Sequence, residues 1–149
     1  MSMKKRYLFP LSLLPALLLV SCSDDEDAVS KEELLKNKRW NIAALQVTSP
    51  SSIDYYQTFA ACQRDNFAQF QEGGVLLMDE GATKCNAPTP QQASGTWSLQ
   101  DDLLHVEGIE ALGIPADKLE LTLTGITNTT LTANFTQGGL TGTLRMAVQ

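Results

Sequence analysis

The sequence predicts an all-β domain, an eight-stranded antiparallel up-and-down barrel with a short N-terminal helix. Short runs of alternating apolar and polar residues, separated by turn residues, fill the chain from about residue 38 onward. Such runs are typical of strands with one buried face. With one short helix available, an apolar sheet face is buried most simply when the sheet closes on itself. A β-sandwich is the alternative, although it usually needs longer crossovers.

Residues 1–21 have the features of a secretory signal peptide. Positive residues at positions 4–6 precede an apolar run over residues 8–20, which is short for a membrane span. The run ends in Leu19-Val20-Ser21-Cys22, which resembles the lipobox of bacterial lipoproteins. The resemblance implies that Cys22 is acylated and becomes the first residue of the mature chain. Two or three acyl chains would anchor the protein stably to the membrane.

Residues 22–30 are predicted to form a lipidated acidic tether. Ser23 after Cys22 favours the outer membrane over the inner one, by resemblance to lipoprotein sorting signals. The run Ser23-Asp24-Asp25-Glu26 also resembles a surface-export tag of lipoproteins in one Gram-negative phylum. A solvated acidic linker is the simpler explanation of the same run. We therefore expect a lipid-anchored outer-membrane protein, with surface exposure as a further expectation.

The net charge limits the classes of binding partner, and the cysteine count indicates a disulfide. The net charge is −6 and becomes −9 once residues 1–21 are removed, so nucleic acid is not an expected partner. The chain has three cysteines, and lipidation of Cys22 leaves Cys62 and Cys85 as a pair in an oxidising compartment.

The domain is predicted to span residues 31–149. It is expected to begin with a helix. Ser30 and Glu33 fit a capping box, which predicts a helix over about residues 31–37. A strand over residues 39–48 follows. Because its apolar residues change phase midway, we expect a β-bulge at Ala43-Ala44.

A hairpin comes next, with strands over residues 66–71 and 75–79 around a turn at 72–74. If the turn is centred between its two glycines, opposed residues have numbers that sum to 147, which Cys62 and Cys85 satisfy. Cysteines that face each other across paired strands lie at bridgeable separation. The sequence therefore predicts a Cys62–Cys85 disulfide that stabilises the fold by about 3 kcal/mol.

The remaining strands are predicted from turns and alternation. Residues 95–99 and 103–107 form another hairpin, and residues 108–117 form a longer connection. Three final strands, over about 118–124, 130–136 and 140–148, alternate apolar with polar residues most regularly. Each of these three strands is expected to have one solvent-exposed face and one buried face.

Several segments together resemble the lipocalin-like domain of bacterial outer-membrane lipoproteins. The similarity covers about residues 31–148. It is carried by Lys38-Arg39-Trp40, by Cys62-Gln63-Arg64-Asp65-Asn66-Phe67 with Phe70 and Gly73-Gly74, by Glu80-Gly81-Ala82-Thr83-Lys84-Cys85, and by Gly95-Thr96-Trp97-Ser98. The resemblance implies a calycin-type barrel able to hold a small apolar molecule.

Two functions are consistent with this reading. In the first, the barrel binds a small apolar ligand. The candidate cavity residues are Trp40, Phe67, Trp97, Leu121, Leu123, Phe135, Leu144 and Met146. In the second, the barrel is solid and the protein is an interaction module, either an inhibitor or an accessory subunit of a surface complex. Eight-stranded barrels occur both filled and hollow. Three aromatic residues in one loop, Tyr55, Tyr56 and Phe59, form either a recognition rim or packing across the barrel end.

No catalytic residue, cofactor or metal site is predicted, and we do not expect an enzyme. His105 is the only histidine and should face outward, with no second ligand at zinc-site spacing. A Gly-x-Ser-x-Gly motif is absent. The acidic pairs Asp79-Glu80 and Asp101-Asp102 lie at strand ends or turns, where solvated carboxylates are common.

Overall fold

The computed structural model describes residues 29–149, so the predicted signal peptide and the lipidation site Cys22 lie outside the described residues. The described part has one α-helix and nine strands. Their bounds are α1 (Lys31–Leu35), β1 (Trp40–Ser49), β2 (Ile53–Asp54), β3 (Phe67–Phe70), β4 (Val75–Asp79), β5 (Gln92–Gln100), β6 (Leu103–Glu107), β7 (Lys118–Ile126), β8 (Thr130–Gln137) and β9 (Leu140–Val148).

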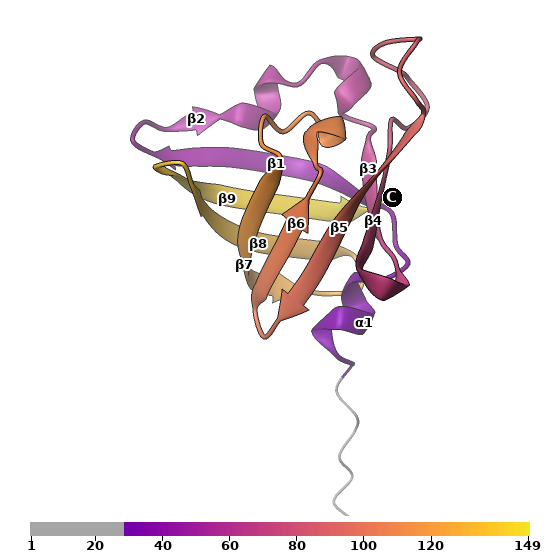
Figure 1. Ribbon diagram of the computed structural model, residues 1–149. Coiled ribbons are helices and arrows are strands. Elements are labelled where there is room, and N and C mark those ends of the chain that lie inside the picture. Colours follow the sequence, from indigo (N-terminus) through magenta and orange to yellow (C-terminus); the bar gives the residue numbers. More distant parts are fainter. Residues whose placement is uncertain (1–28) are drawn as a thin grey trace, which may run out of the picture.

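Eight of these strands form the predicted barrel (Figure 1). Neighbours follow the order β1, β3, β4, β5, β6, β7, β8, β9, and every pair is antiparallel. The ring closes because β1 pairs with β9 along its whole length, from Trp40 to Ser49. The two-residue β2, which the sequence pattern did not predict, pairs with the free edge of β1.

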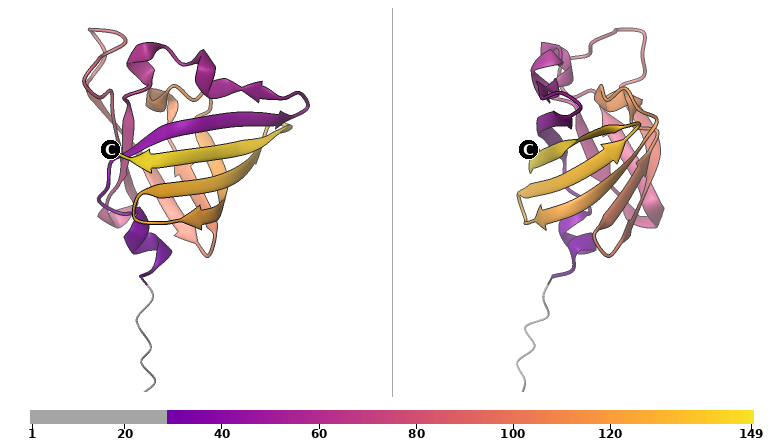
Figure 2. Two further views of the ribbon diagram at one scale, coloured as in Figure 1. Left: turned by 180° about the vertical axis from the view of Figure 1, so that it is seen from behind. Right: turned by 90° about the vertical axis from the view of Figure 1, so that its left-hand side faces the viewer.

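The barrel has two different ends (Figure 2). At the first, which we call the helix end, α1 lies beside the short turns that join β3 to β4, β5 to β6 and β7 to β8. At the opposite loop end lie the three long connections, residues 50–66, 80–91 and 108–117, together with the β8–β9 turn. Lys31, the first residue of the predicted domain, therefore lies at the helix end.

The helix end is closed by buried side chains. The Ser30 capping box is present as predicted, although the helix ends at Leu35 and not at residue 37. Leu35 and Trp40 are both fully buried, and the Trp40 indole N–H donates a hydrogen bond of 2.8 Å to the Leu35 carbonyl. Lys31 forms an ion pair with Asp102, which ties α1 to the β5–β6 turn.

The barrel interior is filled. Alternate residues of every long strand point inward and form one continuous apolar core. A central void has a volume of about 20 Å³ and an entirely apolar lining. That space would hold about one water molecule, and an apolar cavity of this kind stays empty.

Of three local predictions, one is confirmed and two are corrected. The bulge in β1 is confirmed, since the register shifts between Ile42 and Ala44. In the β3–β4 hairpin, however, Phe67 opposes Asp79, so opposed residue numbers sum to 146 and not to 147. The turn is centred on Gly73, whose φ of +72° is left-handed. β5 begins at Gln92, three residues before the predicted start at residue 95.

Candidate functional site

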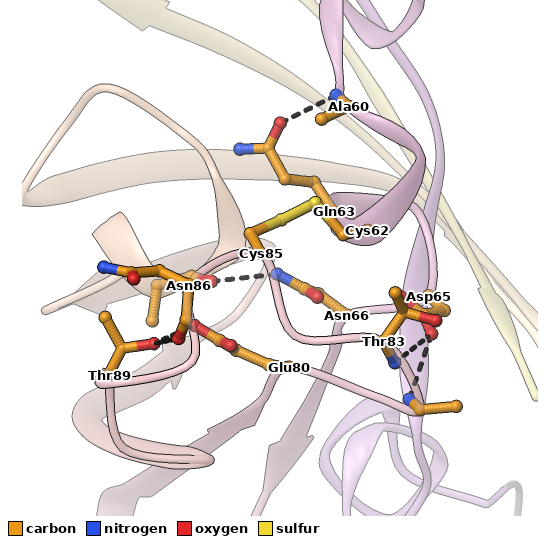
Figure 3. Close-up of a disulfide and its surroundings, with 12 residues drawn as sticks. Ala60, Cys62, Gln63, Asp65, Asn66, Glu80, Thr83, Cys85, Asn86 and Thr89 are labelled. Atoms are coloured by element: carbon orange, nitrogen blue, oxygen red, sulfur yellow. Dashed lines mark hydrogen bonds between the residues drawn. A yellow bond between two sulfur atoms is a disulfide. The ribbon is translucent and has the colours of Figure 1, made fainter.

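The disulfide Cys62–Cys85 lies at the loop end (Figure 3), with a Cα–Cα distance of 5.2 Å. The predicted bridge is confirmed, but the two cysteines are not opposed strand residues. Cys62 belongs to a 3₁₀ helix, η2 (Ala61–Gln63), and Cys85 lies in the β4–β5 connection. The bridge thus joins two of the three long connections.

The carboxylate of Asp65 joins the same two connections beside the disulfide (Figure 3). One oxygen accepts hydrogen bonds from the backbone N–H groups of Ala82 and Thr83, both at 3.0 Å. The chain passes so closely here that a Cβ on Gly81 would lie 2.4 Å from the Asp65 carbonyl oxygen, and Gly81 has a φ of +68°. Only glycine fits this position without a shift of the backbone.

Asp79 holds the beginning of the β4–β5 connection. Burial alone would raise the pKa of this carboxyl, but hydrogen bonds from the Gln92 and Gln91 side chains and from the Gly81 N–H outweigh it, with help from the Arg39 charge. The pKa of Asp79 is therefore below its ordinary value. These bonds measure 2.7 Å from Gln91, 2.9 Å from Gln92 and 2.9 Å from Gly81.

A cleft that we call the polar cleft lies between the three long connections and has a volume of about 420 Å³. Every long connection contributes to it, and Cys85 of the disulfide forms part of its wall. Its polar lining consists of Gln63, Asn66, Glu80, Thr89, Gln92 and Glu110. No lysine or arginine is among the described residues that line it.

A second cleft, the apolar cleft, opens at the mouth of the barrel and has a volume of about 120 Å³. It lies between the loop-end parts of β1, β7, β8 and β9 and the β6–β7 connection. Its lining includes Leu45, Tyr55, Pro115, Phe135 and Leu140. Leu140 is 43% exposed, and Ile53, which pairs with Val47 of the same wall, is 47% exposed.

The predicted cavity residues are buried but do not enclose a common cavity. Three of them, Leu121, Leu144 and Met146, line the central void, and Phe135 lines the apolar cleft. Trp40, Trp97 and Leu123 belong to the core without lining either space.

Phe67 is the exception, because it lies outside the barrel core. It is buried on the outer side of β3, where the Arg39 guanidinium lies 4.9 Å from its ring centroid. Ala68 and Phe70 belong to the core. Phe67 and Phe70 are three residues apart, and residues at an odd spacing in a strand face opposite sides. The sequence therefore contained a signal that both could not line one interior.

The loop aromatic residues pack across the barrel end. Phe59 is 5% exposed and contacts the rings of Tyr55 and Tyr56, with centroids 5.9 Å and 5.6 Å away. This arrangement supports packing for Phe59, whereas Tyr55 also forms part of the apolar cleft.

The residues considered above for catalysis or metal binding do not form a site within the described part of the chain. The His105 Nδ1 lies 3.4 Å from the Glu120 carboxylate, and the pair joins neighbouring strands β6 and β7. Within residues 29–149, no group of three or more His, Cys, Asp or Glu side chains is arranged to hold a metal ion. The same part of the chain has no helix with the length and apolar character needed to cross a membrane.

No protein-family model and no curated protein matches the chain. A lipocalin-like protein from Bacteroides uniformis is similar in structure, with a TM-score of 0.47 and 14% identity over 75% of this chain and 97% of that one. An uncharacterized protein from Bacteroides eggerthii has a TM-score of 0.42 and 14% identity over 72% and 96% of the two chains.

The class of fold follows from the strand order itself. A closed meander of eight antiparallel strands, with one short helix against its N-terminal end, is a lipocalin-like barrel.

Proposed function

We propose that this protein is a lipid-anchored outer-membrane protein, attached through acyl chains on Cys22, that binds a protein partner at the loop end of a solid barrel. The observation that carries the proposal is the contrast between the filled interior, with its void of about 20 Å³, and the open apolar cleft of about 120 Å³. A barrel without internal space acts through its surface. An inhibitor and an accessory subunit of a surface complex are both of this type.

The position of the tether supports this assignment. Residues 22–30 would reach the barrel at the helix end, next to α1, and can span at most about 30 Å. The loop end lies on the opposite side of the barrel (Figure 1). An anchor on Cys22 would therefore attach the barrel at the end opposite the loop end, and it would leave the loop end free to meet a partner.

The apolar cleft has the size of one large side chain. A cavity of about 150 Å³ lined by Leu, Ile and Phe binds benzene, so 120 Å³ suits a single aromatic or branched side chain of a partner. Exposed Ile53 and Leu140 extend the apolar surface beside it. Exposed apolar surface around a pocket is typical of interaction sites, in which a few buried anchors dominate affinity.

Charged substitutions test the partner. We expect Leu140→Asp, introduced into the full chain in its own host, to abolish cross-linking of a partner that the wild-type chain captures. Val75→Asp is the matched control, because Val75 is 39% exposed but lies at the helix end. Equal capture by both variants, or none by the wild-type chain, would contradict the proposal.

The anchor is tested separately. Cys22→Ala should abolish incorporation of a palmitate analogue and release the protein from the membrane fraction. Normal acylation of this variant would refute the lipobox interpretation.

A small apolar molecule in the apolar cleft is the second candidate, favoured by the mostly aliphatic and aromatic lining. Native mass spectrometry of the full chain, purified gently from its own envelope, distinguishes the two. A bound small molecule that leaves on denaturation, and is lost in Leu140→Asp, would favour a ligand carrier. A bare mass together with specific cross-linking would favour the partner.

A further inference from the structure

The polar cleft contains an amide whose oxygen has no partner. Asn66 is 7% exposed, and its Nδ2 donates a hydrogen bond of 3.1 Å to the carbonyl of Ala111. That bond assigns Nδ2 to the side of Ala111, so Oδ1 is the side-chain atom of Asn66 that still needs a hydrogen-bond donor. This oxygen is buried and has no hydrogen-bond partner within the described chain.

Glu80, which also lines the polar cleft and lies beside Thr89 (Figure 3), has a second such oxygen. Its Oε1 accepts a hydrogen bond of 3.0 Å from the Thr89 hydroxyl, whereas its Oε2 is buried without a partner. Glu110 contributes a further carboxylate from the β6–β7 connection. The cleft therefore has an excess of acceptors.

Unpaired buried acceptors are uncommon and costly. About nine in ten buried polar groups have a partner, and a buried group without one destabilises the folded state, more so when it is charged. Among the described residues, four buried side-chain oxygens lack a partner, those of Asn41, Asp65, Asn66 and Glu80, and the last two belong to residues that line the polar cleft. Because no cationic side chain lines this cleft, a donor with positive charge would complement both oxygens and the negative charge of Glu80.

We propose that the polar cleft binds a primary ammonium group, with Glu80 Oε2 and Asn66 Oδ1 as its buried acceptors. An ammonium has three N–H donors and no acceptor, and Glu110 at the exposed side can take the third. Calcium fits less well, since it needs six to eight oxygens and the described chain has no cluster of three carboxylates. The group can come from a free amine or from a lysine side chain of a protein.

The test is an NMR titration of the full chain in detergent that follows the Asn66 side-chain amide. The ligands are n-butylammonium chloride and Nα-acetyl-lysine N-methylamide, with Nα-acetyl-norleucine N-methylamide as the uncharged control. The Asn66 and Glu80 oxygens are covered by neighbouring atoms, so side chains that line the cleft must move when an amine binds. Because this movement costs free energy, we expect a weak Kd of about 1 mM. The norleucine compound should cause no saturable shift.

Substitutions locate the site. Glu80→Gln keeps the acceptor for Thr89 but removes the charge, and it should weaken binding at least about tenfold. Glu110→Gln, at an exposed position, should weaken binding by a smaller factor. Glu120→Gln, on the strand wall beside His105, is the matched control and should leave the affinity unchanged. Thermal unfolding of each variant confirms that it folds.

The results of the titration distinguish a free amine from a lysine side chain, and they can also overturn the proposal. Binding of the lysine compound much more tightly than butylammonium would indicate a lysine of a protein, and equal binding a free amine. An absence of saturable shifts with both amines, an unchanged affinity in Glu80→Gln, or shifts with Ca²⁺ alone would overturn the proposal. None of these results depends on the apolar cleft, so the partner proposal is tested independently.

Discussion

The disulfide is expected to supply a large share of the stability of the loop end. The perturbation is the double substitution Cys62→Ala with Cys85→Ala, which removes the bridge without leaving a free thiol at either position. The two cysteines are 23 residues apart. Closing a loop of that size removes about 3 kcal/mol of chain entropy from the unfolded state at 25 °C.

That free energy converts into a measurable temperature shift. For a domain of about 120 residues, the entropy of unfolding is about 0.25 kcal/mol/K near the midpoint, so the loss corresponds to a decrease in Tm of about 12 °C. The assay is thermal unfolding of the full chain in detergent, followed by circular dichroism. Wild-type chain treated with a reductant is the control and should unfold near the temperature of the double variant.

A Tm within about 2 °C of the oxidised wild-type chain would refute this reasoning. It would mean that the unfolded chain without the bridge is already about as restricted as the bridged one. The double variant should also bind ammonium more weakly, because two of the three walls of the polar cleft lose their covalent link.

Three further predictions concern stability. Leu35→Ala should cost about 2–5 kcal/mol because Leu35 is fully buried, whereas Leu34→Ala on the partly exposed side of α1 should cost less; urea unfolding compares them. Gly81→Ala should lower Tm, because its Cβ would meet the Asp65 backbone at 2.4 Å; an unchanged Tm would contradict that geometry. Asp79→Asn should reduce the acid sensitivity of unfolding. The folded-state pKa of this carboxyl is lowered, so its stabilisation is present above its ordinary value near 3.8 and is lost as the pH falls through the folded-state value. A wild-type pH profile in the variant would argue against this role.

Regular alternation made most of the barrel predictable. In β7, β8 and β9 one face is apolar along the whole strand, and a slip of one residue would expose all of it, so the pattern determines the register. The capping box similarly marked the start of α1, because its two hydrogen bonds are local.

The hairpin between β3 and β4 shows where such reasoning ends. Its register depends on the backbone conformation of Gly73, and a sequence contains two adjacent glycines without saying which one is the centre. The disulfide prediction succeeded with the wrong register because Cys62 lies beyond the strand, where chain reversal through η2 brings it near Cys85.

The state of the interior could not be predicted for a different reason. Whether Leu121, Leu144 and Met146 leave a ligand cavity or a void of about 20 Å³ depends on the packing of the whole core, including small residues such as Ala68. Packing of this kind depends on volumes and rotamers of many side chains at once, and the pattern of apolar positions is the same in filled and hollow barrels.

The unpaired groups at the loop end lie next to open clefts, which supports a functional loop end. At the helix end, Trp40 and Leu35 are fully buried and the indole N–H has a partner. At the loop end, Leu140 is exposed and the oxygens of Asn66 and Glu80 lack partners. Proteins tolerate such departures from good packing and pairing mainly where function requires them. The Asn66 and Glu80 oxygens belong to residues that line the cleft between the three long connections, so a ligand bound in that cleft would complete their pairing.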